Sequence, residues 1–296
     1  MASRVEFSSY GDPSVLQVAE FEPGTPGPDE VLVRNEAIGV NPFDYKYVAG
    51  QTGGKPLTAP SVPGNEAAGV VQAVGDAVSQ FRVGDEVVWR GYLGAYATHS
   101  VVAASKVYPK PSSLSFAEAA ALPVAAGTAW AAVHQAGVQA GDVVLVHAAS
   151  GGVGSAAVQI AVSLGARVIG TASAKNQDYV RSLGAKPVVY GAGLVEAVRA
   201  LGTVTAIVDA VGSADAVAAS RELMPGLERA ITTAHAEGFT AVKSEPAAIP
   251  SVLALAAQGE LRTDITREFP LAEAAAALEL SKTGHVRGKI VLLPTL

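Results

Sequence analysis

A glycine-rich turn between a predicted strand and a predicted helix carries the clearest chemical signal of this sequence. Residues 143–147 (VVLVH) form an apolar run with one histidine and predict a short buried strand, and residues 155–161 (SAAVQIA) begin a helical pattern. Glycines in such a turn let the backbone approach a pyrophosphate, and the free N–H groups at the start of the helix attract its charge. The order of strand, turn and helix predicts a dinucleotide-binding βαβ unit, in which the phosphates contact Ser150, Gly151, Gly152, Val153 and Gly154.

The segment after the next predicted strand, 167–171 (RVIGT), indicates which dinucleotide is bound. An NAD site usually has Asp or Glu about 20 residues after the glycines, where the carboxylate binds the ribose 2′-hydroxyl. Residues 170–176 (GTASAKN) contain no carboxylate, whereas Ser173 and Lys175 supply a hydroxyl and a cation that suit a 2′-phosphate. We therefore expect NADPH as the cofactor. The alternative is that Lys175 is an ordinary exposed lysine at the start of the next helix.

Length and composition narrow the class of protein. A chain of 296 residues suggests about two domains, and the 49% of hydrophobic residues allow a large core. The net charge of −6, with scattered basic residues, argues against a nucleic-acid partner. The absence of cysteine excludes disulfides and thiolate zinc sites. The N-terminus has no apolar signal core and the most apolar stretch, 116–133, is interrupted, so we expect a cytoplasmic protein without a membrane span.

The strand and helix signals change character near residue 115. Before that point the predicted strands do not alternate regularly with helices, which favours an antiparallel, barrel-like domain; the strands are 5–10, 16–21, 30–40, 67–74, 86–89 and 95–107. From there to about 260, alanine-rich helices alternate with strands, which predicts a parallel sheet; the strands are 143–147, 167–171, 188–190, 205–210 and 230–233. A helix at 271–282 and a strand at 289–294 follow. The fold class is therefore α/β.

Several motifs, in this order, resemble a known family. They are GVNPFDYK at 39–46, PGNEAAG at 63–69, VGDEV at 83–87, ALP at 121–123 with GTAW at 127–130, and GKIVL at 288–292. With the glycine turn, they are similar to the zinc-independent medium-chain dehydrogenase/reductases, namely the NADPH:quinone oxidoreductases and the alkenal or enone reductases. The resemblance implies a GroES-like β-barrel catalytic domain over 1–118, completed by 264–296, and a Rossmann domain with a doubly wound parallel sheet over 119–263.

The same comparison bears on metal binding. Zinc-dependent relatives carry Cys near position 41 and His at position 65, where this chain has Asn41 and Asn65. The five histidines include no pair at ligand spacing. We therefore expect hydride transfer that uses no metal.

Hydride transfer needs alignment and a partner for the negative charge that develops on the substrate oxygen. Lys46 is the expected partner, because the enone branch of the family has a lysine at this point of the motif; the alternative is a solvated lysine on a short helix. Asn41 is expected to contact the nicotinamide ribose or the substrate oxygen, or only to cap the turn before Pro42. Tyr45 is expected to line the pocket or donate a proton, or only to pack. Asp44 is expected to hold the turn by hydrogen bonds.

The resemblance implies further cofactor contacts. Thr128 is expected near the nicotinamide or its phosphate, Tyr190 near the adenine ribose phosphate, and Val211 and Gly212 under the adenosine half. A basic residue near the C-terminus, Arg287 or Lys289, is expected to touch phosphate, and the alternative for Arg287 is a surface charge.

We expect an NADPH-dependent reductase of quinones or α,β-unsaturated carbonyl compounds that acts on a small molecule, binds neither nucleic acid nor membrane, and forms a homodimer as its family commonly does. Two alternatives stay open. One is an NADPH-binding structural or regulatory protein with little turnover, as in the zeta-crystallins. The other is a reductase of enoyl thioesters, for which the sequence shows no clear basic patch.

Overall fold

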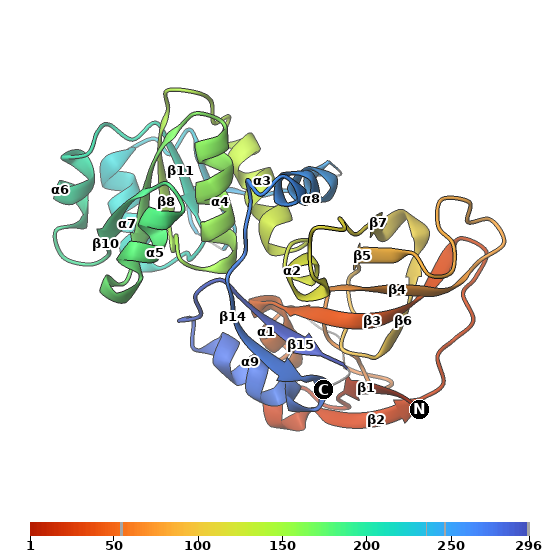
Figure 1. Ribbon diagram of the computed structural model, residues 1–296. Helices are drawn as coiled ribbons and strands as arrows, with labels where there is room; N and C mark the ends of the chain where they lie inside the picture. Colours follow the sequence, from red (N-terminus) through yellow and green to blue (C-terminus); the bar gives the residue numbers. More distant parts are fainter. Residues whose placement is uncertain (54–55, 235, 246, 295–296) are drawn as a thin grey trace. The chain divides into compact units, whose positions relative to one another are not determined.

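The computed structural model describes residues 1–53, 56–234, 236–245 and 247–294, which form two compact units (Figure 1). Unit 1 comprises Met1–Val124 and Asp264–Leu296, and unit 2 comprises Ala125–Thr263. The predicted junction at 118/119 falls inside helix α2 (Phe116–Ala120). That helix packs against strands of unit 1, so the chain leaves the unit only after Val124.

Unit 1 is built mainly from antiparallel strands. Its sheet has the order β14-β15-β3-β4-β5-β7, with β6 also paired to β3, and a separate hairpin joins β1 to β2. In this sheet β14 pairs with β15 in parallel, and the other pairs formed by the described strands are antiparallel. The elements are β1 (Ala2–Glu6), η1 (Pro13–Val15), β2 (Gln17–Phe21), β3 (Glu30–Val40), α1 (Pro42–Val48), β4 (Glu66–Val74), β5 (Glu86–Arg90), β6 (His99–Ala103), η2 (Ala104–Lys106), β7 (Val107–Pro109), α2, β14 (Ile265–Pro270), η4 (Leu271–Glu273), α9 (Ala274–Lys282) and β15 (Lys289–Leu293).

Strand β3 is shared by several neighbours and gives the unit its barrel-like form. Buried and half-buried residues alternate along its first half, and Val31 and Val33 lie in the core. One edge pairs with β4, with register shifts, while the other pairs first with β6 and then with β15. A strand that changes partners in this way bends the sheet around a core. The predicted antiparallel, barrel-like fold is confirmed.

The C-terminal segment completes the core of unit 1. Leu278 of α9 and Ile290 and Leu292 of β15 belong to the same buried cluster as Phe7 and Trp89. Figure 1 shows β15, in blue, beside the red-orange β3, and the two strands are antiparallel from Ile38 to Val40. A segment distant in sequence therefore supplies an inner strand of the first sheet.

Unit 2 contains a parallel sheet with the order β10-β9-β8-β11-β12-β13. Helix α3 packs against α4 and α8, and α6 packs against α7. The run VVLVH of β8 is buried at every position, as expected for a strand in the interior of a parallel sheet. The elements are α3 (Ala125–Gln135), β8 (Val143–His147), α4 (Gly152–Ser163), β9 (Arg167–Ala172), η3 (Ala174–Asn176), α5 (Gln177–Ser182), β10 (Lys186–Val189), α6 (Leu194–Arg199), β11 (Ala206–Asp209), α7 (Ala214–Leu223), β12 (Ala230–Thr232), β13 (Thr240–Ala241) and α8 (Ala248–Ala257).

Some predicted strand bounds were wrong. The single strand predicted at 95–107 is two short strands, β6 and β7, separated by η2. Residues 95 and 96 instead bond to the backbone of Gly64 and Pro63, so they cannot continue the β6 ladder. Within the described part of the chain, no helix is both long and apolar enough to span a membrane.

Candidate active site

The order of the parallel sheet marks a topological switch point. From β8 the chain runs to one side through β9 and β10, and then to the other side through β11, β12 and β13. Strands β8 and β11 are neighbours, with His147 opposite Asp209 at their carboxyl ends. Doubly wound sheets bind ligands beyond the strand ends at such a point. A ligand site is therefore expected at the residues that follow His147 and Asp209.

The turn after β8 is tightly held. Ala148 has a φ of 53°, a left-handed conformation that costs a residue with a Cβ about 1–2 kcal/mol. The N–H of Ala149 donates to the carbonyl of Thr171 on β9 (2.8 Å), and that of Gly151 donates to Ala148 (3.0 Å). A strained residue fixed by its neighbours is common where a backbone must meet a ligand.

Gly154 lets helix α4 approach this turn. A Cβ at position 154 would lie 2.1 Å from the Ala148 oxygen, so any larger residue would force the helix away from β8. The first intrahelical bond runs from Ser155 N–H to the Gly151 carbonyl. The N–H groups of Gly152, Val153 and Gly154 precede it and have no partner within the helix. They are suited to bind an anion at the helix N-terminus.

The end of β9 places the two residues predicted to bind a 2′-phosphate. The Ser173 hydroxyl oxygen is buried and has no hydrogen-bond partner among the described residues. Lys175, in η3, is exposed and forms no ion pair within the described chain. Sequence reasoning missed Asn176, which is buried and donates to the Ser150 hydroxyl (3.2 Å). This contact ties the glycine turn to the segment after β9.

The turn after β11 is organised by Asp209, which sequence reasoning also missed. Its carboxylate is fully buried and accepts the N–H groups of Val211 and Gly212 at 3.0–3.1 Å, as well as the Thr232 hydroxyl at 2.8 Å. The Val211 side chain is exposed. The signal for Asp209 was its position at the end of a buried strand, where a carboxylate needs backbone donors.

Two other predicted cofactor residues lie in unit 2. Tyr190 follows β10 directly and is 53% exposed, so its ring is accessible. Thr128 lies near the start of α3 and is half-buried.

The last residue of β8, His147, is buried and bonds to other buried side chains. His147 Nε2 bonds to the Ser220 hydroxyl (3.0 Å) and Nδ1 to the Thr171 hydroxyl (3.3 Å), and all three side chains are buried. Desolvation lowers the pKa of His147, and the charge of Asp209 only partly opposes it. His147 is therefore a core histidine.

In unit 1, the motif at 39–46 forms the end of β3 and helix α1. Asn41 is the residue that caps α1, and its N–H donates to the Asp44 carboxylate (2.8 Å), so Asp44 holds the turn as predicted. Lys46 is exposed, with Nζ 6.0 Å from the centre of the Tyr45 ring. Tyr45 is half-buried against the core.

The Asn41 side chain belongs to a buried polar cluster that sequence reasoning did not foresee. Its amide nitrogen donates to Glu66 (2.8 Å), and its amide oxygen accepts from Lys289 (2.7 Å). Glu66 and Lys289 are 0% and 4% exposed and form an ion pair at 2.8 Å. The motifs at 39–46, 63–69 and 288–292 thus meet in one place.

Asp44 lies beside this cluster and is fully buried. One carboxyl oxygen accepts from Asn41 N–H and from the Tyr96 hydroxyl (2.9 Å), while the other has no hydrogen-bond partner among the described residues. Burial raises the pKa of Asp44 to about 7, against the opposing effects of these hydrogen bonds and of Lys289.

The two basic residues predicted to touch phosphate have different surroundings. Lys289 donates all three of its protons within unit 1, to Val40 O, Asn41 Oδ1 and Glu66 Oε1. No donor of this ammonium is left for a phosphate, so that role does not fit Lys289. Arg287 is exposed and its Nε bonds to Asp264 (2.6 Å).

Asn65, at the second position where zinc-dependent relatives have a ligand, donates to the carbonyl of Tyr92. Among the described residues, no three His, Asp or Glu side chains gather as a metal site would need. His235 lies outside the described residues.

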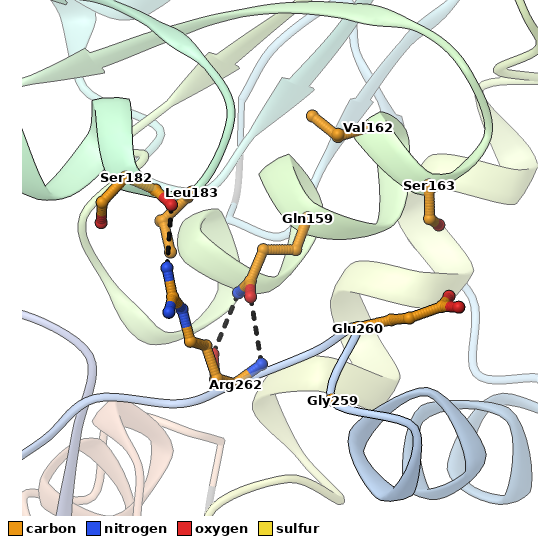
Figure 2. A pocket seen from close by; sticks show the side chains of 8 residues that line it. All are labelled: Gln159, Val162, Ser163, Ser182, Leu183, Gly259, Glu260 and Arg262. Carbon is orange, nitrogen blue, oxygen red and sulfur yellow. Dashed lines mark hydrogen bonds between the residues drawn. The ribbon is translucent and has the colours of Figure 1, made fainter.

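A separate groove of about 530 Å³ lies near the far half of helix α4 (Figure 2). Figure 2 shows the Gln159 side chain bonded to both the backbone N–H and the carbonyl of Arg262, and the Arg262 guanidinium bonded to Ser182 O. Gln159 is seven residues beyond the start of α4, about 10 Å along the helix axis from the glycine turn. None of the predicted site residues lines this groove.

Comparisons with known proteins agree with both units. The model of the alcohol dehydrogenase GroES-like domain matches residues 27–112, and that of the zinc-binding dehydrogenases matches residues 183–292. The quinone oxidoreductase of Pseudomonas aeruginosa is 42% identical over 178 residues, 58% of this chain and 53% of that protein, so this match spans about half of the relative. Quinone oxidoreductase 1 of Escherichia coli is 31% identical over 99% of this chain and 100% of that protein.

Solved structures show the same architecture over nearly the whole chain. An NAD-dependent alcohol dehydrogenase has a TM-score of 0.92 at 31% identity, covering 98% of this chain and 99% of that one. The quinone oxidoreductase of Escherichia coli in complex with NADPH has a TM-score of 0.86 at 28% identity, covering 99% and 100%. The fold, with the glycine turn at the switch point of the unit 2 sheet, defines a medium-chain dehydrogenase/reductase. Within that class, the chain belongs to the quinone oxidoreductase family.

Proposed function

We propose that the chain is an NADPH-dependent oxidoreductase that transfers a hydride, without a metal, to a quinone or an α,β-unsaturated carbonyl compound. The observation that carries this proposal is the glycine turn at the switch point of the unit 2 sheet, followed after β9 by a hydroxyl and a lysine in place of a carboxylate. The NADPH complex of the Escherichia coli relative supports the choice of cofactor.

The residues of unit 2 fit a phosphorylated dinucleotide. A Cβ on Gly151 would meet only the Ala148 oxygen, at 3.5 Å, so the glycine leaves open space at the start of α4. The Ser173 hydroxyl and the Lys175 ammonium have no partner among the described residues and suit a 2′-phosphate, and no carboxylate in 170–176 repels it. The proposed contacts are Thr128, Ser150, Gly151, Gly152, Val153, Gly154, Ser173, Lys175, Tyr190, Val211 and Gly212, with Asn41 and Arg287 from unit 1.

When bound, NADPH supplies the hydride. The task of the protein is then to orient the acceptor and to stabilise the negative charge that develops on its oxygen. We assign that charge stabilisation to the exposed ammonium of Lys46. In this proposal Tyr45 lines the substrate pocket or donates a proton, and Asn41 forms a hydrogen bond with the ribose or the substrate.

Two features support chemistry without a metal at the positions where the relatives bind zinc. The chain has no cysteine, and its residues there are Asn41 and Asn65. The Asn41 amide is bound on both sides, by Glu66 and Lys289, and the amide nitrogen of Asn65 donates to the Tyr92 carbonyl. Neutral amides held in this way are poor substitutes for a thiolate and an imidazole.

The proposed assembly is a cytoplasmic homodimer. Strand β13 ends the parallel sheet and both of its residues are exposed, so its edge offers unpaired backbone groups to a second copy.

The decisive experiment compares NADPH with NADH. Replacing Lys175 by Ala should weaken NADPH binding about 10–100-fold, the value of a charged hydrogen bond, and leave NADH nearly unchanged. Lys186→Ala is the matched control, because Lys186 is an exposed lysine at the opposite end of the neighbouring strand β10. Equal losses for both cofactors, or no loss, would remove Lys175 from the site. A parent protein that binds NADH more tightly than NADPH would instead favour NAD, as in the name of the structurally similar alcohol dehydrogenase.

The same protein is then assayed for NADPH oxidation with naphthoquinones, phenanthrenequinone and 2-alkenals. We expect turnover with at least one of these classes. Tight NADPH binding without turnover on the whole panel would contradict the enzyme and favour a structural or regulatory binding protein.

A further inference from the structure

The buried ion pair of unit 1 is built so that it can hold the Asn41 amide in one orientation. An ammonium group only donates hydrogen bonds and a carboxylate only accepts them. Lys289 therefore specifies the side of the amide that carries Oδ1 (2.7 Å), and Glu66 specifies the side that carries Nδ2 (2.8 Å). Turning the amide over would place its oxygen against the carboxylate and its N–H groups against the ammonium.

The two charged residues are themselves fixed. Lys289 has three acceptors, Val40 O, Asn41 Oδ1 and Glu66 Oε1, at 2.7–2.8 Å, which use all three protons of an ammonium. The second oxygen of Glu66 accepts the N–H of Val124 at 2.6 Å. Neither side chain can move away without leaving a buried charge unpaired.

The surrounding backbone leaves no space for another arrangement. A Cβ on Gly39 would lie 2.4 Å from Glu66 Oε1 and 2.5 Å from the Ala120 carbonyl, so the glycine is required for the carboxylate to sit there. The antiparallel pairing of Ile290 with Val40 brings Lys289 opposite Asn41. The Asn41 N–H is bound by Asp44. What remains of Asn41 for another molecule is one amide proton and one lone pair of Oδ1.

A buried ion pair is weak evidence for stability, because desolvation of two charges opposes their attraction. Its value lies in specificity. We propose that Glu66 and Lys289 are positioning residues, which hold the Asn41 amide in the orientation that contacts the reactants. This inference rests on the proposed function, in which Asn41 hydrogen-bonds the nicotinamide ribose or the substrate oxygen.

The test removes both charges together, in the variant Glu66→Gln/Lys289→Met, because a single replacement would leave one buried charge without its partner. The matched control is Asp142→Asn/Arg229→Met, which removes the ion pair at the start of β8 in unit 2. A third variant, Asn41→Ala, deletes the amide itself.

The first readout does not depend on activity. The chain has four asparagines, at 35, 41, 65 and 176, so selective ¹⁵N labelling gives few side-chain amide signals, and Asn41→Ala identifies the one of interest. We expect two well-separated, slowly exchanging amide protons for Asn41 in the parent and in the control variant. In Glu66→Gln/Lys289→Met we expect their separation to shrink and their exchange with solvent to become at least tenfold faster. Unchanged signals would overturn the proposal.

The second readout is a kinetic cycle. We expect Glu66→Gln/Lys289→Met to lower kcat about tenfold or more with KM for NADPH unchanged, and the control to leave kcat unchanged. In the Asn41→Ala background the same two replacements should lower kcat no further, because they act through the amide. Losses that multiply in that background, or an equal kcat loss in the control, would assign the pair a merely structural role and overturn the proposal. If none of the acceptors tested supports NADPH oxidation by the parent protein, the proposed function fails. The amide signals alone then decide whether the pair positions Asn41.

Discussion

The carboxyl group of Asp44 should make the stability of unit 1 depend on pH in the direction opposite to that of an ordinary salt-bridged carboxylate. Asp44 is fully buried, and burial raises its pKa from 3.8 to about 7. Between these two values the folded protein keeps the proton, whereas the unfolded chain has lost it. The contribution of Asp44 to stability is therefore greatest below pH 4, falls as the pH rises to about 7, and is constant above.

The size of this effect follows from the shift. A difference of this size between folded and unfolded pKa corresponds to about 4 kcal/mol in the free energy of unfolding. Between pH 5 and pH 8, a practical window, the free energy of unfolding is expected to change by about 3 kcal/mol of this total. Asp44→Asn is the informative replacement, because an amide oxygen can still accept from Asn41 N–H and from the Tyr96 hydroxyl but does not titrate.

Other groups titrate in the same pH window, and their contributions to the free energy of unfolding must be separated from that of Asp44. Desolvation lowers the pKa of His147, so the unfolded chain binds a proton that the folded protein refuses, and this contribution to stability grows as the pH rises through the ordinary range of histidine. It is present in the parent and in Asp44→Asn, and it cancels in the difference between their unfolding free energies. The pKa of Asp142 is lowered by Arg229, so Asp142 has finished titrating below the window.

The assay can follow unit 1 alone. The chain has two tryptophans, Trp89 in unit 1 and Trp130 in unit 2. In a Trp130→Phe background, fluorescence during urea unfolding reports the environment of Trp89, which is 1% exposed and donates to Asn35 (3.0 Å). We expect the stability of Asp44→Asn relative to the parent to rise by about 3 kcal/mol between pH 5 and pH 8. A difference that stays constant over this window would show that burial does not hold the proton on Asp44.

Two further predictions concern catalysis and assembly. Lys46→Met should lower turnover about 100-fold with little change in NADPH affinity, because an ammonium that stabilises the developing oxyanion acts in the transition state; the exposed Lys106→Met is the control, and unchanged turnover would return Lys46 to the role of a solvated lysine. Sedimentation velocity should give twice the mass of one chain, and Ala241→Lys, which puts a charge on the exposed edge of β13, should shift the protein toward monomers. A parent that sediments as a monomer at all concentrations would contradict the homodimer.

The sequence by itself determined the features that depend on local patterns. The strand VVLVH, the glycine turn and the start of α4 follow one another within twelve residues, so their hydrophobic run, their glycines and their helical period predict the βαβ unit without knowledge of other segments. Strand β3 was predicted with its observed bounds, because it follows turn residues and carries a local strand signal.

Only the tertiary structure decided the partners of the buried charges. Lys289 is 248 positions from Asn41, and the family resemblance placed it or Arg287 at a phosphate. The register of β15 on β3 instead buries it between Asn41 and Glu66. Such a contact depends on which strands become neighbours and on which face is buried, and no local pattern encodes either. The same holds for Asp44, which bonds to Tyr96 across 52 positions and whose burial in the folded unit raises its pKa.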